Sequence, residues 1–325
     1  MGQARQVAIR LFIKARTHSL SSFGYPVLSG CNVIRSKVQH LTLTTTLRLC
    51  TFELVSFFPL HFCISDNRDV STAIMTSSSS ALAPTLWAAR IPLHITHASS
   101  PVTSPFITSI PRFSYLALLL PRLSAYFGTP CSSFHFEDVQ LRNLAVGLLA
   151  DLYQPSLPWR LTVNDGIGWD IGDTFLNCVK EADFIRNGNA NQIMKMSKDH
   201  TTQLWNSVID NDYASFSRIQ TRLLNAPTAL KHIPLRIYIP TADEATAGSY
   251  RVVQSLVPST TADRKPQLLG QALKNMLPGL FPSSRDPVLV GVVLHGAAVP
   301  FEAPLGELMR EAAYPDGWLC FVVTI

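Results

Sequence analysis

From Leu86 to the end of the chain, apolar residues recur with the two spacings that are typical of strands and helices. The first patterned block predicts one short helical turn that ends near Arg90-Ile91-Pro92. It then predicts the order strand, strand, helix, strand, helix, strand, which suits a small mixed sheet covered on one face by a helix. Pro121 is expected to interrupt the first of these helices. The segments concerned are IPLHITH (91–97), FITSIPRF (106–113), SYLALLLPRLSAYF (114–127), SSFHFEDV (132–139), LAVGLLADLY (144–153) and LPWRLTVND (157–165).

Residues 167–226 carry only helical patterns. In the clearest one, Asp173 is expected to cap the amino end of a helix, and Asn187-Gly188 to end it in a left-handed conformation. The apolar stripe of this helix consists of Phe175, Val179 and Ala182. One long helix is then expected to pass through Ile193, Met196, Leu204 and Val208 to Asp210-Asn211-Asp212, and another to run from Tyr213 to Leu223.

The last patterned block repeats the element order of the first. HIPLRIYIP (232–240) and SYRVVQSLV (249–257) predict a hairpin, followed by a helix, a strand, a short helix and the terminal strand WLCFVVTI (318–325). Each block of about 80–95 residues has the size and element order of a ubiquitin-like β-grasp fold. The predicted fold class is therefore α+β: two ubiquitin-like β-grasp domains, at 81–166 and 229–325, flank a helix-rich region at 167–228, with a short helix before the first domain.

The first eighty residues differ from the patterned part in charge. Residues 1–52 contain seven Lys or Arg and no acid, and Glu53 is the first carboxylate. Three interpretations remain open: a disordered extension or gene-model artefact with Met75 as the start, a mitochondrial targeting segment, or a folded role. Residues 76–325 contain nineteen basic and nineteen acidic residues, so they offer no overall basic character that would favour nucleic acid.

Cysteine usage and apolar run length indicate a soluble, cytoplasmic protein. The cysteines form no C-x-x-C pair, have no zinc spacing with histidine, and stand at Cys31, Cys50, Cys63, Cys131, Cys178 and Cys320. The longest apolar runs are shorter than the roughly 20 residues that a membrane-spanning helix requires. No metal site and no cofactor site is predicted.

Common catalytic motifs are absent from the sequence. It has no G-x-x-x-x-G-K-[ST], no H-E-x-x-H and no G-x-S-x-G, so no catalytic site is expected. It also lacks the Gly-Gly end of a ubiquitin-like donor, which favours an acceptor. Cys178 suggests a thiol enzyme as one alternative, but its place inside a helix is more typical of a packed cysteine.

Seven segments in order resemble the signature blocks of the autophagy-related protein 5 family: ARIPLHI, IPRFSYLALLLP, GLLADLY…LPW, CVKEAD, HIPLRIY, LHG…PLGEL and AYPDGWL. The resemblance covers about 86–325 and implies two ubiquitin-like domains around a helical region. It also implies that Lys180, in CVKEAD, accepts the ubiquitin-like autophagy protein 12 through an isopeptide bond formed by the conjugating enzyme autophagy protein 10. The conjugate would bind autophagy protein 16 and promote lipidation of autophagy protein 8 at preautophagosomal membranes, as a peripheral membrane factor.

By the same resemblance, the autophagy protein 16 groove maps to Leu86, Trp87, Arg90, Ile91 and Arg112. Tryptophan and arginine often dominate binding energy at protein interfaces. The alternative is that Trp87 only holds the short helix against the sheet.

Lys180 lies at the edge of the apolar stripe, where partial desolvation would favour the reactive free amine, whereas the neighbouring Glu181 would oppose it. Activation is therefore expected mainly from the conjugating enzyme. A second hypothesis keeps the same fold as a non-covalent scaffold with Lys180 unmodified. The other lysines after residue 81 are expected to be solvated charges, although Lys195 and Lys198 could approach anionic lipid.

Overall fold

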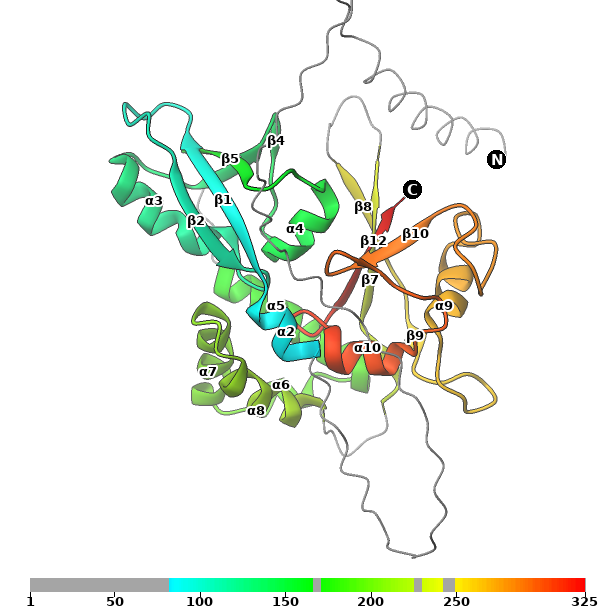
Figure 1. The fold of residues 1–325 in the computed structure, drawn as a ribbon. Helices are drawn as coiled ribbons and strands as arrows, with labels where there is room; N and C mark the ends of the chain where they lie inside the picture. Colours follow the sequence, from blue (N-terminus) through cyan, green and yellow to red (C-terminus); the bar gives the residue numbers. More distant parts are fainter. Residues whose placement is uncertain (1–81, 166–170, 225–229, 242–248, 325) are drawn as a thin grey trace, which may run out of the picture. The chain divides into compact units, whose positions relative to one another are not determined.

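The computed structural model describes residues 82–165, 171–224, 230–241 and 249–324. Figure 1 shows the fold and gives the element labels used below. The three interpretations of residues 1–80 lie outside the described residues. Residues 79–325 form one compact unit.

The first domain is a five-stranded mixed sheet in the order β2-β1-β5-β3-β4. Its first and last long strands, β1 and β5, lie side by side in parallel, with Leu93 opposite Trp159. Its elements are α2 (Leu82–Ala88), β1 (Arg90–His97), β2 (Phe106–Pro111), the 3-10 turn η1 (Leu116–Leu119), α3 (Leu120–Phe127), β3 (Ser133–Phe136), β4 (Val139–Gln140), α4 (Val146–Tyr153) and β5 (Trp159–Asn164).

Two details of the first domain differ from the prediction. Pro121 does not interrupt a helix but lies in the first turn of α3, where its missing amide hydrogen has no intrahelical partner to lose. The strand β4 was not predicted, because two residues are too short to show an alternating pattern.

Four helices follow the first domain: α5 (Ile171–Asn187), α6 (Asn191–Met194), α7 (Lys198–Ile209) and α8 (Tyr213–Leu224). Gly188 has a φ of 73°, which confirms the predicted left-handed stop of α5. The predicted cap was wrong, because α5 begins at Ile171 and Asp173 lies within its first turn. The prediction of one long helix through Ile193 and Val208 was also wrong, because α6 and α7 are separate helices. Ser197 caps the amino end of α7, and its hydroxyl accepts a 3.3 Å hydrogen bond from the amide of His200.

The second domain is another five-stranded mixed sheet, in the order β11-β10-β12-β7-β8. The parallel neighbours are again the first and last long strands, with Leu235 of β7 opposite Leu319 of β12, and the predicted β7–β8 hairpin is confirmed. A short pair, β6–β9, was not predicted. The elements are β6 (His232–Ile233), β7 (Leu235–Pro240), β8 (Tyr250–Gln254), β9 (Val257–Pro258), α9 (Leu269–Met276), β10 (Gly291–Leu294), β11 (Ala297–Ala298), α10 (Leu305–Ala312) and β12 (Leu319–Thr324).

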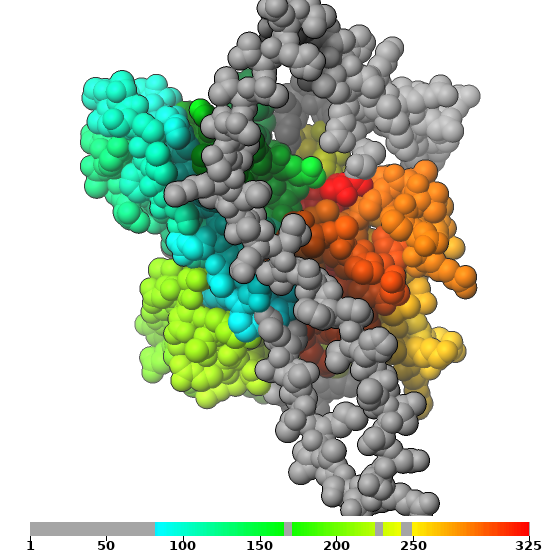
Figure 2. Space-filling model, viewed as in Figure 1, coloured from blue at the N-terminus to red at the C-terminus, as the bar shows by residue number. Residues whose placement is uncertain are grey.

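The two sheets, each with a central parallel pair, and the helices between them confirm the predicted fold class. One hydrophobic cluster lies wholly within residues 91–163 of the first domain. The other joins α2, the helical region and the second domain, together with Phe113, Tyr115, Ala145 and Leu148 of the first domain. The space-filling view shows α2, in cyan, at the surface between the yellow-green helices α7 and α8 and the orange-red second domain (Figure 2).

Within the described ranges, no helix has the length and apolar character needed to cross a bilayer. The three cysteines in these ranges, Cys131, Cys178 and Cys320, are free thiols. The same ranges contain no group of three or more side chains that could hold a metal ion.

Candidate functional site

Lys180 lies near the middle of α5 and its side chain is exposed to solvent. Val179, one position earlier, is 1% exposed and faces the core, so the two residues lie on different sides of the helix. The Lys180 ammonium donates a 3.3 Å hydrogen bond to Asn177 Oδ1. The expectation that the lysine is partly desolvated is therefore wrong.

The turn of α5 that carries Lys180 is fixed to the second domain by several contacts. Trp318 is 1% exposed, and its Nε1 donates a 3.1 Å hydrogen bond to the backbone carbonyl of Cys178. The Arg236 guanidinium lies 3.8 Å from the centroid of the Trp318 ring and pairs with Glu181 at 2.8 Å. The ion-pair partner of the Glu181 carboxylate is therefore Arg236 of the second domain.

A shallow hollow of about 330 Å³ lies directly beside Lys180. Its lining is mostly apolar and consists of Lys180, Glu181, Phe184, Ile185, Gln254 and Trp318. Phe184 is 56% exposed, although the equally large Phe175 on the same helix is 1% exposed.

Cys178 is partly buried, and burial raises the pKa of its thiol, with the Asp316 carboxylate acting in the same direction. The Arg236 guanidinium opposes this shift, with its Nη1 at 3.9 Å from Sγ. A raised pKa disfavours the thiolate that a thiol enzyme requires. The geometry therefore gives no support to the thiol-enzyme alternative.

The five predicted groove residues come together around the junction of α2 and β1. Leu86 and Trp87 are in α2, Arg90 and Ile91 begin β1, and the amide of Arg112 donates a 2.9 Å hydrogen bond to the Ala89 carbonyl. Their accessibility differs strongly. Trp87 is 4% and Ile91 6% exposed, whereas Leu86 is half-buried and Arg90 is exposed.

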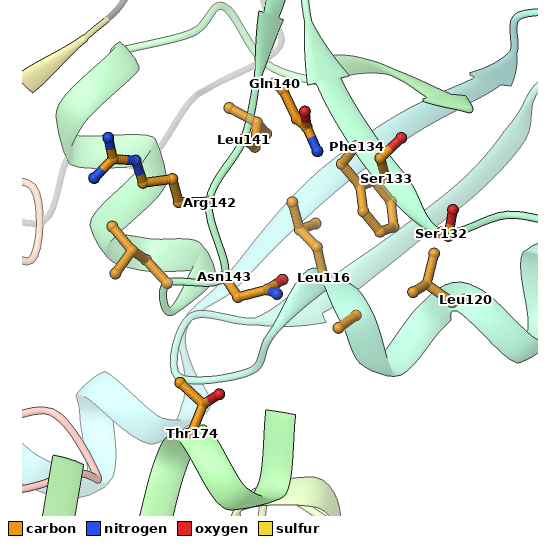
Figure 3. A pocket seen from close by; sticks show the side chains of 12 residues that line it. Leu116, Leu120, Ser132, Ser133, Phe134, Gln140, Leu141, Arg142, Asn143 and Thr174 are labelled. Atoms are coloured by element: carbon orange, nitrogen blue, oxygen red, sulfur yellow. The ribbon is translucent and has the colours of Figure 1, made fainter. Parts of the chain in front are cut away.

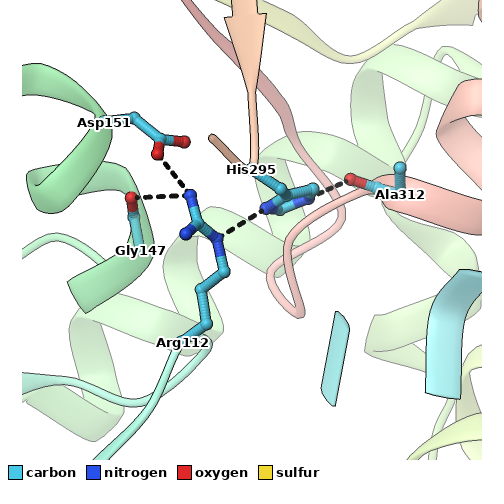
Figure 4. Close-up of polar contacts among 5 residues, drawn as sticks. All are labelled: Arg112, Gly147, Asp151, His295 and Ala312. Carbon is cyan, nitrogen blue, oxygen red and sulfur yellow. Dashed lines mark hydrogen bonds and ion pairs between the residues drawn. The ribbon is translucent and has the colours of Figure 1, made fainter. Parts of the chain in front are cut away.

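The side chain of Arg112 joins the two ubiquitin-like domains, reaching Asp151 of the first and His295 of the second (Figure 4). Its guanidinium pairs with Asp151, donates to the Gly147 carbonyl at 3.1 Å, and lies with Nε 3.4 Å from His295 Nδ1. His295 Nε2 lies 2.8 Å from the Ala312 carbonyl. Since a carbonyl can only accept, His295 carries its proton on Nε2 and its Nδ1 accepts from Arg112.

Burial sets the protonation of this cluster. Burial raises the pKa of Asp151, while Arg112 lowers it in partial compensation. Burial lowers the pKa of His295 to about 4, so the ring is neutral near pH 7. Gly147 permits the close approach, because a Cβ there would lie 2.2 Å from Arg112 Cγ.

A larger hollow, of about 590 Å³, lies within the first domain and reaches the start of α5 (Figure 3). Apolar side chains such as Leu116, Leu120 and Phe134 form much of its wall, and Thr174 of α5 closes one end. Among the described residues that line it, the only ionisable side chain is that of Arg142, whose guanidinium carbon lies 4.9 Å from the centroid of the Tyr250 ring. This hollow therefore lacks the convergent reactive groups of a catalytic pocket, in spite of its size.

Sequence reasoning missed Asp151, Arg236, His295 and Trp318. Asp151 and Arg236 were visible as charges inside otherwise apolar segments, LAVGLLADLY and HIPLRIYIP. Their partners were not visible, because Arg236 and Glu181 are 55 residues apart and Arg112 and His295 are 183 apart.

Comparisons with known proteins match almost all of the described part. Three family models cover residues 86–165, 170–226 and 232–323: the UblA domain, the alpha-helical bundle region and the UblB domain of autophagy protein ATG5. Autophagy-related protein 5 of Gibberella zeae is 72% identical over 253 residues, covering 76% of this chain and 99% of the relative. The corresponding protein of Beauveria bassiana is 66% identical, with 76% and 99% covered.

A solved structure shows the same fold. The crystal structure of Kluyveromyces marxianus Atg5 matches with a TM-score of 0.62 at 22% identity, and the match covers 75% of this chain and 99% of that one.

Proposed function

The chain belongs to the autophagy protein 5 family, and on that basis we propose that it is the acceptor of autophagy protein 12 at Lys180. The conjugating enzyme autophagy protein 10 would supply the modifier as a thioester. The conjugate would bind autophagy protein 16 and promote lipidation of autophagy protein 8 at preautophagosomal membranes. In this proposal the chain has no catalytic site of its own and is the scaffold of a ligase-like complex.

The observation that carries the proposal is the combination of an exposed amine and a fixed helix. Lys180 is open to an approaching partner, while Trp318 and Arg236 hold the preceding and following residues of α5 against the second domain. An acceptor amine that is held in one place reduces the entropy lost when a thioester is brought to it.

The proposed reaction is an aminolysis. The neutral Lys180 Nζ attacks the thioester carbonyl of the modifier's terminal glycine, a C–N bond forms, and the C–S bond breaks. The thiolate leaves on the conjugating enzyme, and the amine nitrogen releases one proton to solvent. No cofactor or oxidant enters this balance.

For autophagy protein 16, we propose the surface around α2 and the start of β1. Leu86 and Arg90 are accessible there, whereas Trp87 and Ile91 would support the surface from beneath. Arg112 would act at a distance, by holding the second domain in place.

A Lys180→Arg variant tests the covalent proposal, because arginine keeps the charge and helix propensity but is not a nucleophile. Wild-type protein in cells should show an adduct heavier by about one small ubiquitin-like protein, and Lys180→Arg should lose it. Lys198→Arg, at an exposed lysine of α7, is the matched control and should keep the adduct.

Two results would contradict the covalent proposal. An adduct that persists in Lys180→Arg would place the bond elsewhere. If wild-type protein carries no adduct but still co-purifies with its partners, the second hypothesis, a non-covalent scaffold, is correct.

A further inference from the structure

The side chain of Asn177 contacts the amine of Lys180. The two residues are three positions apart on α5, which makes them neighbours on the helix surface. Asn177 Oδ1 lies 3.3 Å from the Lys180 ammonium, and both side chains are exposed. Because an ammonium group can only donate hydrogen bonds, the amide oxygen of Asn177 is the acceptor. The polar group that holds the proposed acceptor amine is therefore an uncharged one.

The carboxylate nearest to Lys180 along the same face of α5 is turned into the protein. Asp183 lies three positions after Lys180 but is 0% exposed. Its Oδ1 accepts a 2.7 Å hydrogen bond from Asn187 Nδ2. Its Oδ2 accepts from the backbone amides of Gln192, at 3.0 Å, and Ile193, at 3.1 Å. This carboxylate is thus engaged at the end of α5 and the start of α6.

Two further carboxylates close to this turn of α5 also have other partners. Glu181 follows Lys180 directly, and Arg236 of the second domain pairs with it at 2.8 Å. Asp316, in the turn before β12, accepts a 3.2 Å hydrogen bond at Oδ1 from the backbone amide of Trp318. Each nearby carboxylate therefore has a partner other than Lys180, and the amine keeps the neutral amide.

A neutral partner suits an amine that must lose a proton before it reacts. A carboxylate stabilises the ammonium form over the free amine, whereas an amide oxygen accepts a hydrogen bond from either form. A free amine has two N–H bonds and one lone pair. When one N–H is donated to Asn177 Oδ1, the lone pair is directed away from Asn177 and is available to an incoming electrophile.

We propose that Asn177 is a positioning residue for transfer of the modifier to Lys180, an inference that rests on the proposed function. Its side-chain oxygen holds one N–H of the amine while the nitrogen lone pair attacks the thioester carbonyl carbon. The C–N bond forms, the C–S bond breaks, and the thiolate leaves on the conjugating enzyme. The nitrogen releases one proton to solvent, and Asn177 itself takes up none.

The first test measures single-turnover transfer of purified modifier, preloaded as a thioester on its conjugating enzyme, to full-length protein. Asn177→Ala should lower the maximal transfer rate about three- to tenfold, the loss expected for one hydrogen bond. The acceptor concentration that gives half the maximal rate should stay unchanged, because the contact orients the amine and does not bind the enzyme. Asn206→Ala, at an exposed asparagine of α7, is the matched control and should transfer at the wild-type rate.

The second test separates orientation from charge. Asn177→Asp keeps an acceptor oxygen of similar reach but adds a carboxylate that favours the ammonium, so transfer should slow about twofold at low salt. This deficit should disappear at about 1 M salt, where exposed charges are screened, whereas the deficit of Asn177→Ala should persist. Asn206→Asp carries the same charge change away from Lys180 and should match wild type at each salt concentration. Circular dichroism should show all four variants folded, because both asparagines are exposed.

Two outcomes overturn the inference. If Asn177→Ala reaches the wild-type maximal rate, the amine needs no partner on α5. If Asn177→Ala instead raises the half-maximal acceptor concentration at an unchanged maximal rate, Asn177 contacts the conjugating enzyme and does not position Lys180. In both cases the proposed function stands as long as Lys180→Arg abolishes the adduct, and it fails separately if Lys180→Arg does not.

Discussion

At the scale of single residues, Trp87 shows how one side chain fastens a short helix. Its ring lies 5.4 Å from Phe113, 5.8 Å from Tyr213 and 4.6 Å from Phe216, measured between centroids. Its carbonyl accepts a 3.2 Å hydrogen bond from Asn211 Nδ2. A seven-residue helix such as α2 is marginal alone, so these contacts hold it in place.

We therefore expect Trp87→Ala to lower the free energy of unfolding by about 3–5 kcal/mol, the range for removing a large buried aromatic side chain. Equilibrium denaturation in urea measures the change. Leu82→Ala, at a 42% exposed position of the same helix, is the control and should change stability by less than about 1 kcal/mol. A Trp87→Ala protein of wild-type stability that fails only to bind its partner would show that Trp87 is a contact residue instead.

At the scale of elements, the turn between β10 and β11 carries His295 into the junction of the two domains. The ring is neutral because burial lowers its pKa to about 4, against about 6.5 for an unperturbed histidine. Arg112, Asp151 and Tyr314 face it, and the Tyr314 ring lies 4.6 Å away between centroids. Between pH 6.5 and 4 the unfolded chain binds a proton at this site that the folded chain does not.

Stability should therefore fall as pH is lowered through that window, by up to about 3 kcal/mol from His295. Denaturation at pH 7, 6, 5 and 4 measures the total change. Asp316 changes stability in the opposite sense: because burial raises its pKa to about 6, its protonation favours the folded chain as pH falls. The contribution of His295 must therefore be isolated by comparing the wild type with a variant at each pH.

His295→Asn is a suitable variant, because asparagine does not titrate and tolerates the left-handed backbone at this position, where φ is 53°. The stability difference between wild type and His295→Asn should shrink, or reverse, toward pH 4. A difference that stays constant from pH 7 to pH 4 would mean that His295 titrates normally.

Sequence patterns located elements well where periodicity and turn chemistry agreed. The end of α5 was predictable because Asn187-Gly188 combines the end of an apolar stripe with a residue suited to positive φ. The break at Ser197 was missed because Ile193 and Leu204 keep a helical spacing across it, and only the cap shows that a new helix begins.

Some residues of the candidate sites could be predicted from the sequence, whereas others could not. Lys180 and the α2–β1 residues followed from the resemblance of local segments. The exposure of Phe184 and the cluster of Arg112 with His295 depend on how distant segments pack, and one sequence contains no local signal for that.

At the scale of the whole described unit, the two ubiquitin-like domains differ in how independent they are. The first encloses its own cluster, drawn entirely from residues 91–163. The second shares its cluster with α2, with the helices and with four buried residues of the first domain, Phe113, Tyr115, Ala145 and Leu148, and Trp318 contacts α5 directly. Helix α5 is therefore part of the core of the second domain and not a separate appendage.

This difference predicts distinct behaviour of fragments. Fragment 82–165 should unfold cooperatively on its own, because it keeps the whole cluster at 91–163, even though Phe113, Tyr115 and Leu148 lose the partners that bury them in the intact chain. Fragment 230–325 should unfold at a lower urea concentration than fragment 171–325, because removing α5–α8 exposes apolar side chains that the helices cover. Near-ultraviolet circular dichroism follows the tertiary packing of each fragment.

Equal urea midpoints for 230–325 and 171–325 would show that the second domain does not need the helices. The link between Lys180 and that domain would then rest mainly on polar contacts, such as those of Trp318 with Cys178 and of Arg236 with Glu181.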